Sequence, residues 1–91
     1  MKEHILFDRP INVGTQQVYK FPNGYGASVV RGPYTYGGKD GKFEIAVLKF
    51  GDGDSYKLCY DTEITDGVLG HIEPSDVDGI LHKIQELPTQ G

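Results

Sequence analysis

The sequence contains one cysteine and no tryptophan. A single thiol, Cys59, excludes an internal disulfide and any zinc site built from several cysteines. Small domains without disulfides are typical of reducing compartments, so the interior of a cell is the expected setting.

Long apolar runs are missing as well. No stretch approaches the roughly 18 to 20 consecutive apolar residues that cross a membrane as a helix. The first ten residues, MKEHILFDRP, lack the apolar core and the small-residue cleavage site of a signal peptide. We therefore expect a cytoplasmic protein without a membrane partner.

Positive charge is scarce in the second half of the chain. Residues 1–50 hold seven Lys/Arg and four Asp/Glu, a balance of +3, whereas residues 51–91 hold two and nine, a balance of −7. The two balances account for the net charge of −4. An acidic surface repels nucleic acid and attracts basic surfaces, so no direct nucleic-acid binding is expected. This half suits a basic protein partner or mimicry of nucleic acid, and its plainer role is to keep a small protein soluble.

The first half of the chain predicts a β-hairpin. Val18–Phe21 and Tyr25–Arg31 are strand-like segments on either side of Asn23-Gly24, the dipeptide preferred in two-residue type I′ turns. Residues 1–17 contain Pro10, which permits an edge strand or an irregular arm but not a central strand.

The second half predicts further strands and then one helix. Phe43–Phe50 has apolar residues on both faces, as a central strand does, and Ser55–Thr62 alternates with period two. Ser75 follows Pro74 as a helix N-cap, and an apolar stripe then runs along one helix face: Val77, Ile80, Leu81, Ile84 and Leu87.

Together these segments predict a single α+β domain over residues 1–91. Its sheet is antiparallel with four strands, or five if the N-terminal segment joins it, and the C-terminal amphipathic helix packs on one face. The expected parts are an N-terminal arm or edge strand (1–17), an antiparallel sheet (18–62), a turn region (63–74) and the helix (75–87).

No catalytic or metal motif is complete. Gly24-Tyr25-Gly26 begins a dinucleotide fingerprint, but the third glycine is missing and a strand follows in place of a helix. Counted from Asp52, a calcium loop would have Lys57 where its glycine is required. Cys59, His71 and Asp61 have no spacing that specifies a nucleophile set. We expect no enzymatic activity, no metal and no cofactor.

Tyrosine is the abundant aromatic residue, with six copies. Tyr34 and Tyr36 lie in a segment, residues 32–42, with four glycines and one proline, and Arg31 precedes it. Tyrosine and arginine are enriched at the energetic centres of protein interfaces. The alternatives are that about half of the tyrosine rings cover the core, or that this loop stacks the base of a nucleotide.

The order of segments resembles a family of small uncharacterised bacteriophage and prophage proteins. The resemblance covers residues 19–87 and is carried by NGYGASV, the YGG loop, LCYDT and ITDGVLG. It implies a phage accessory protein that acts inside an infected bacterium. By analogy such a protein would inhibit a host enzyme or a defence system, as anti-CRISPR proteins do.

The leading hypothesis is a non-enzymatic phage protein that inhibits a host protein with a basic surface, such as a nucleic-acid-handling or defence (CRISPR-type) component. Its expected contact residues form an acidic face and a tyrosine-rich loop: Tyr34, Tyr36, Arg31, Asp52, Asp54, Asp61, Glu63, Asp66, Glu73, Asp76 and Asp78. Two alternatives remain, with the protein a monomer or a homodimer. One is a nucleotide-binding module that sequesters a defence signalling molecule, and the other is a homo-oligomeric structural or assembly factor.

Overall fold

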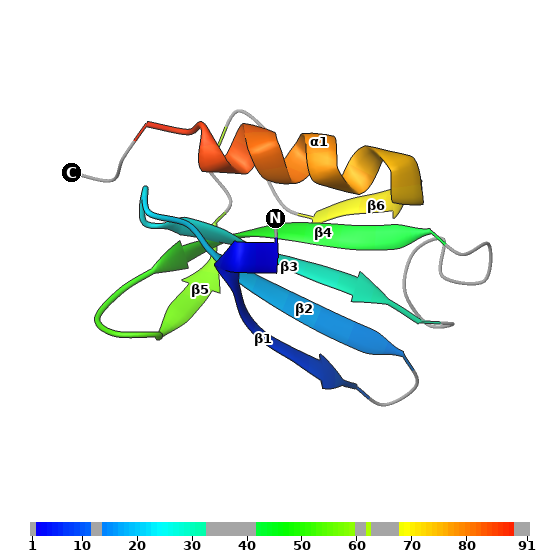
Figure 1. The fold of residues 1–91 in the computed structure, drawn as a ribbon, viewed down its shortest axis with the longest axis horizontal. Coiled ribbons are helices and arrows are strands. Elements are labelled where there is room, and N and C mark those ends of the chain that lie inside the picture. The colour runs from blue at the N-terminus through cyan, green and yellow to red at the C-terminus, as the bar shows by residue number, and fades with distance from the viewer. Residues whose placement is uncertain (1, 12–13, 33–41, 60–61, 63–67, 89–91) are drawn as a thin grey trace.

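The fold combines an antiparallel sheet with one C-terminal helix, which confirms the predicted α+β class (Figure 1). It is taken from a computed structural model, which describes residues 2–11, 14–32, 42–59, 62 and 68–88. The elements are a 3-10 helix η1 (Lys2–His4), strands β1 (Ile5–Pro10), β2 (Thr15–Lys20), β3 (Tyr25–Arg31), β4 (Phe43–Phe50), β5 (Tyr56–Leu58) and β6 (Val68–Ile72), and helix α1 (Pro74–Gln85).

The strands lie in the order β1-β2-β3-β4-β5, so each of the first five pairs with its neighbours in sequence. Strand β4 is central, as predicted. One of its edges pairs with β3, and its other edge is divided: Leu48–Phe50 pair with β5, and Phe43–Ala46 pair with β6. We call β5 and β6 together the interrupted edge strand. Opposite it, β1 forms the other edge, so the first segment is an edge strand, with Pro10 as its last residue.

Helix α1 covers one face of the sheet, and the core lies between them (Figure 1). Four residues of the predicted apolar stripe lie on α1: Leu81 and Ile84 are buried, and Val77 and Ile80 pack against the same cluster. The helix ends at Gln85, before the predicted end at residue 87, and Leu87 is buried beyond it. From the sheet, the cluster receives Tyr19, Phe21, Ala27, Val29, Ile45, Val47 and Cys59.

The prediction of Ser75 as the N-cap is wrong. The helix begins at Pro74, and Glu73 is the N-cap residue without a side-chain hydrogen bond. A backbone N–H at the first helical position has no acceptor within the helix. Proline, which has no N–H, therefore loses no hydrogen bond there. The helix therefore begins one residue earlier, and Ser75 lies within its first turn.

The β2–β3 turn also differs from its prediction. Only one non-glycine residue in the described part of the chain has a positive φ, and it is His71. Asn23 therefore does not have the left-handed conformation that a type I′ turn requires. Instead the Gly24 N–H donates to the Phe21 carbonyl (3.2 Å), the Phe21 N–H donates to the Tyr25 carbonyl (2.9 Å), and Gly24 has φ 87°. These features define a three-residue loop, a type I turn followed by a left-handed glycine.

Strand β6 lies within the segment expected to be a turn region, so that expectation is wrong for Val68–Ile72. The segment 63–74 contains two glycines, which weaken a helix, and one of them, Gly70, lies in β6, where an edge strand with a bulge tolerates it. The register against β4 shifts between Phe43 and Ile45, and His71 has φ 56° at this irregularity. Pairing with the free edge of β4 is a long-range contact that local sequence patterns do not report.

Within the described residues, no helix has the length and apolar character needed to cross a membrane.

Candidate binding surface

Among the described residues, no helix covers the face of the sheet opposite α1, and we call it the helix-free face (Figure 1). Residues directly opposite one another on paired strands share a face, so the register identifies its members. They are Phe7 and Arg9 from β1, Gln16, Val18 and Lys20 from β2, Gly26, Ser28 and Val30 from β3, Glu44, Ala46, Leu48 and Phe50 from β4, Tyr56 and Leu58 from β5, and Val68 from β6.

Exposed apolar surface is concentrated on this face. Among the described residues, the exposed large hydrophobic side chains are Tyr56 (37% exposed), Leu58 (42%) and Val68 (44%). All three lie on the helix-free face and on the interrupted edge strand. The middle of the face exposes little apolar surface, since Val18 and Leu48 are almost fully buried. The exposed apolar residues therefore form a strip along one edge. Clustered apolar residues mark interaction sites, whereas single scattered ones are normal on any protein surface.

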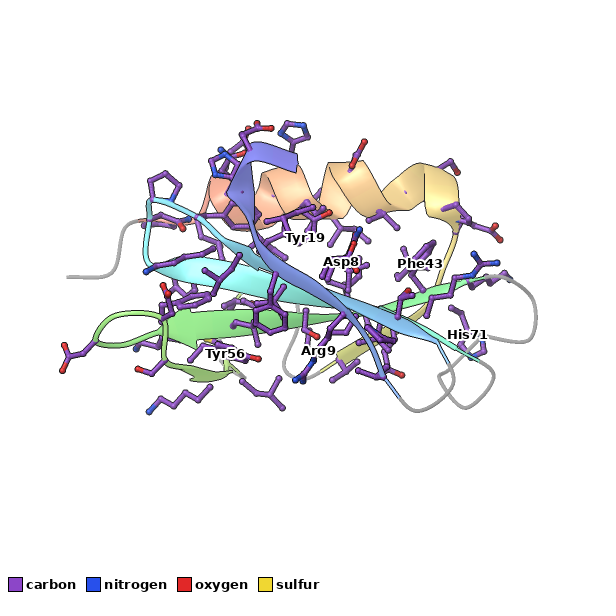
Figure 2. The ribbon with its side chains drawn as sticks, turned by 60° about the horizontal axis from the view of Figure 1, so that its bottom comes forward. Asp8, Arg9, Tyr19, Phe43, Tyr56 and His71 are labelled. Carbon is purple, nitrogen blue, oxygen red and sulfur yellow. The ribbon has the colours of Figure 1, made fainter. Side chains whose placement is uncertain are left out.

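An aromatic pair borders the strip at the β4–β5 end. The Phe50 and Tyr56 rings have centroids 5.4 Å apart (Tyr56 is labelled in Figure 2). The Phe50 ring packs against Gly26, where a Cβ would collide with the ring and with the Tyr19 carbonyl oxygen. The Lys20 ammonium is 5.4 Å from the Phe50 ring centroid and 3.1 Å from an Asp54 carboxylate oxygen.

Polar residues border the opposite side of the face. Arg9 Nε donates to Gln16 Oε1 (2.9 Å), and Gln16 Nε2 donates to the Ser28 hydroxyl (2.9 Å). The Arg9 guanidinium also lies 5.2 Å from the centroid of the Phe7 ring. An apolar strip beside an ordered polar border has the composition of a protein interface, in which polar residues surround a hydrophobic centre.

The predicted acidic face is divided by the fold. Asp52 and Asp54 lie in the β4–β5 turn, whereas Glu73, Asp76 and Asp78 lie at the start of α1, at the other end of the sheet (Figure 1). Asp54 pairs with Lys20, and Glu73 pairs with Lys42 at 3.3 Å. Asp61, Glu63 and Asp66 lie outside the described residues. The described carboxylates thus form two separate groups, each with one internal ion pair.

Arg31 precedes the segment predicted as a tyrosine-rich loop. Arg31 is exposed at the end of β3, with its guanidinium 5.7 Å from the Phe43 ring centroid (Phe43 is labelled in Figure 2). Tyr34 and Tyr36 lie outside the described residues. Phe43, which Arg31 contacts, follows Lys42 in the sequence, whereas the β4–β5 turn with Asp52 and Asp54 lies at the other end of the sheet (Figure 1).

A hydrogen-bonded chain lies on the helix side of β1 and β2. The Tyr19 hydroxyl donates to Gln17 Oε1 (3.1 Å), and Gln17 Nε2 donates to Asp8 Oδ2 (3.3 Å) (Asp8 and Tyr19 are labelled in Figure 2). Burial raises the pKa of the Tyr19 hydroxyl, and the charges of Asp78 and Asp8 raise it further.

The considered nucleophile set is not assembled among the described residues. Cys59 is a buried thiol in the core cluster, whereas His71 is exposed on β6, and Asp61 is outside the described part. Across the described ranges, no group of three or more His, Cys, Asp or Glu side chains is arranged to hold a metal ion.

Sequence analysis missed Leu58, Val68 and Phe50 as surface residues. A signal for Leu58 was present, because Tyr56 and Leu58 alternate with polar neighbours and one helix covers only one face of a sheet. No local signal marks Val68, because β6 forms only by pairing with β4.

No family model, curated protein or solved structure matches the chain. Function is therefore inferred from the chemistry of these residues.

Proposed function

We propose that this protein is a non-enzymatic binding domain that docks a partner protein on the strip of Tyr56, Leu58 and Val68. One observation carries the proposal: the exposed large hydrophobics of the described residues lie on one face and along one edge. The nearby Phe50–Tyr56 pair adds rigid aromatic area, which contributes strongly to binding when a partner buries it.

The proposed setting follows from the resemblance to phage proteins. There the partner is a host protein in the bacterial cytoplasm, and binding inhibits it by covering its working surface. A defence or nucleic-acid-handling protein fits best, because such proteins carry basic surfaces and this chain has a net charge of −4. The acidic residues then accelerate encounter, and the apolar strip holds the complex together.

Site-specific photo-crosslinking tests the docking surface directly. A photoreactive phenylalanine analogue replaces Leu58 in one variant and His82 in another, and both variants are produced in the bacterial host. Both positions are exposed, but His82 lies on α1, on the other side of the molecule. We expect one defined protein crosslinked at position 58 and none at position 82. A Val68→Asp change in the same chain should abolish that product.

The product also distinguishes the competing roles. A crosslink between two copies of this chain at position 58 would support the assembly-factor alternative and contradict the proposal. Equal crosslinking at both positions, or a product that survives Val68→Asp, would show that the strip is not the docking surface.

A further inference from the structure

A hollow of about 320 Å³ lies between strand β6 and helix α1. Its lining includes Ile72 from β6 and Ser75, Asp76, Gly79, Ile80 and Lys83 from α1. The helix residues recur at intervals of three and four, so they form one side of the helix. This volume is at the lower end of the range for ligand pockets, roughly 300 to 1,000 Å³. The hollow therefore has room for a short segment of a partner chain.

Gly79 keeps this hollow open. It is exposed in the interior of α1, and no atom of the described residues lies within 4 Å of the position that a Cβ would occupy. A glycine inside a helix costs about 1 kcal/mol relative to alanine, and this fold does not need one here for close packing. A side chain at position 79 would occupy the open space of the hollow. The glycine thus weakens the helix and preserves a space for binding.

The hollow has an apolar floor. Ile72 and Ile80 are half-buried and pack against the core cluster, so the fold holds both side chains in place. Ile72 lies on the helix side of the sheet, because it pairs with Phe43, and Ile45 two residues further along β4 is part of the core. A preorganised apolar surface binds an apolar side chain at a smaller cost in conformational entropy than a mobile one does. The floor therefore suits one apolar residue of a partner.

Opposite charges flank this floor. Asp76 and Lys83 are both exposed and line the hollow seven residues apart, which is about 10 Å along the helix axis. Neither side chain forms an ion pair in the part of the chain that the structure describes. An extended chain covers the same distance in about three residue steps. The two charges therefore complement an extended segment that has an acidic residue towards one end and a basic residue towards the other.

We propose that this hollow binds an extended segment of the partner protein. An apolar residue of that segment lies on Ile72 and Ile80. An acidic residue lies beside Lys83, and a basic residue lies beside Asp76. The inference rests on the proposed function, because it assigns the hollow and the strip to the same partner. Strand β6 connects the two surfaces, since Ile72 lines the hollow and Val68 belongs to the strip on the opposite face, so a partner that reaches around this edge strand contacts both.

Photo-crosslinking at the rim of the hollow tests this inference. The photoreactive phenylalanine analogue replaces Ser75, which is exposed, and this variant is produced in the bacterial host beside the position-58 variant. Mass spectrometry of each product identifies the partner and the crosslinked segment. We expect the same partner at both positions. The segment crosslinked at position 75 should contain an apolar residue with an acidic and a basic residue within about three positions of it.

Three substitutions in the position-75 chain examine the hollow itself. Gly79→Leu fills it and should lower the crosslinking yield at least about tenfold. Its melting temperature should be unchanged or higher, because leucine favours the helix, so the loss is not a loss of fold. His82→Leu places the same side chain on α1 outside the hollow and should leave the yield unchanged. Lys83→Gln should lower the yield about twofold to fivefold, since an exposed charge pair contributes modestly.

The outcomes separate this inference from the proposed function. A product at position 58 with none at position 75 would overturn the inference and leave the proposed function standing. No product at either position would contradict both. The inference also fails if the yield survives Gly79→Leu, if the crosslinked segment has no acidic residue, or if the position-75 product joins two copies of this chain.

Discussion

The side-chain amide nitrogen of Asn23 lies 2.9 Å from the main-chain oxygen of Ile84, 61 residues further along the chain. It also lies 3.0 Å from the Gln85 oxygen and 3.1 Å from the Leu87 oxygen. The Asn23 side-chain oxygen accepts from the Tyr25 N–H at 3.1 Å. The last carbonyls of a helix have no partner within it, so the β2–β3 loop serves as the C-cap of α1.

Replacement of Asn23 by alanine should lower the free energy of unfolding by about 1 to 3 kcal/mol. The reason is that Asn23 is only 7% exposed and its loss removes a donor from the Gln85 and Leu87 carbonyls, whereas the Ile84 carbonyl keeps the Leu87 N–H at 3.2 Å. Urea denaturation measures the change. Asn23→Asp keeps the acceptor for Tyr25 but places a negative charge at the helix C-terminus, where the dipole disfavours it. It should be at least as destabilising, and wild-type stability in that variant would contradict the capping role.

The two faces of the sheet should respond differently to truncation. Ile45 is completely buried beneath α1, so Ile45→Ala should cost about 2 to 5 kcal/mol in unfolding free energy. Leu58 is 42% exposed, and Leu58→Ser should cost less than about 1 kcal/mol. The comparison uses chemical denaturation of both variants. A large loss for Leu58→Ser would mean that the side chain is needed for folding and is not free for a partner.

Stability should fall in alkaline solution in part through Tyr19. Its pKa is raised above the ordinary value near 10, so the folded state holds this proton more tightly than the unfolded state does. Below pH of about 10 both states keep the proton and Tyr19 has no effect. Above that pH the unfolded state loses it first, and stability declines until the pH reaches the raised pKa of the folded state.

Denaturation midpoints between about pH 9 and 11 would show this decline. In Tyr19→Phe the decline should be shallower, because the remaining tyrosines and lysines still titrate. An identical pH profile in the two proteins would contradict the role of Tyr19.

Two glycines should respond in opposite ways to replacement by alanine. Gly79 lies in α1, is exposed and has no atom within 4 Å of the position that a Cβ would occupy. Gly79→Ala should stabilise the protein by about 1 kcal/mol, because alanine favours the helix. Gly24 has φ 87°, and Gly24→Ala should destabilise it by about 1 to 2 kcal/mol. Thermal unfolding of both variants measures the difference, and shifts of the same sign would contradict the assignment.

The elements that the sequence predicted well are those whose signals are local. The apolar stripe of α1 and the apolar residues on both faces of β4 are signals within one segment, so the helix and the central strand were both predicted. Their contact in the core is a finding of the structure. The predicted start of the helix was wrong by one residue. Ser75 and Pro74 both suit the beginning of a helix, and only the backbone conformation distinguishes the two possibilities.

Other features depend on contacts that no short window contains. Strand β6 and the left-handed His71 exist because β4 offers a free edge, and the cap of α1 comes from a loop near residue 23. The same holds for the candidate site. Composition indicated that the second half of the chain is acidic. The fold, however, puts the β4–β5 turn with Asp52 and the start of α1 beside Glu73 at opposite ends of the sheet. The exposure of Leu58 and Val68 follows from which face α1 covers.

The order of the strands has a consequence for how the chain folds. Strands β1 to β5 each pair with a neighbour in sequence, so most ladders close short loops and lose little chain entropy when they form. The bonds from Asn23 to the helix end close a loop of about 60 residues and need both a formed hairpin and a formed helix. We therefore expect the sheet to be largely assembled in the folding transition state and the helix end to dock late. A substitution at Asn23 should then accelerate unfolding and leave the folding rate almost unchanged.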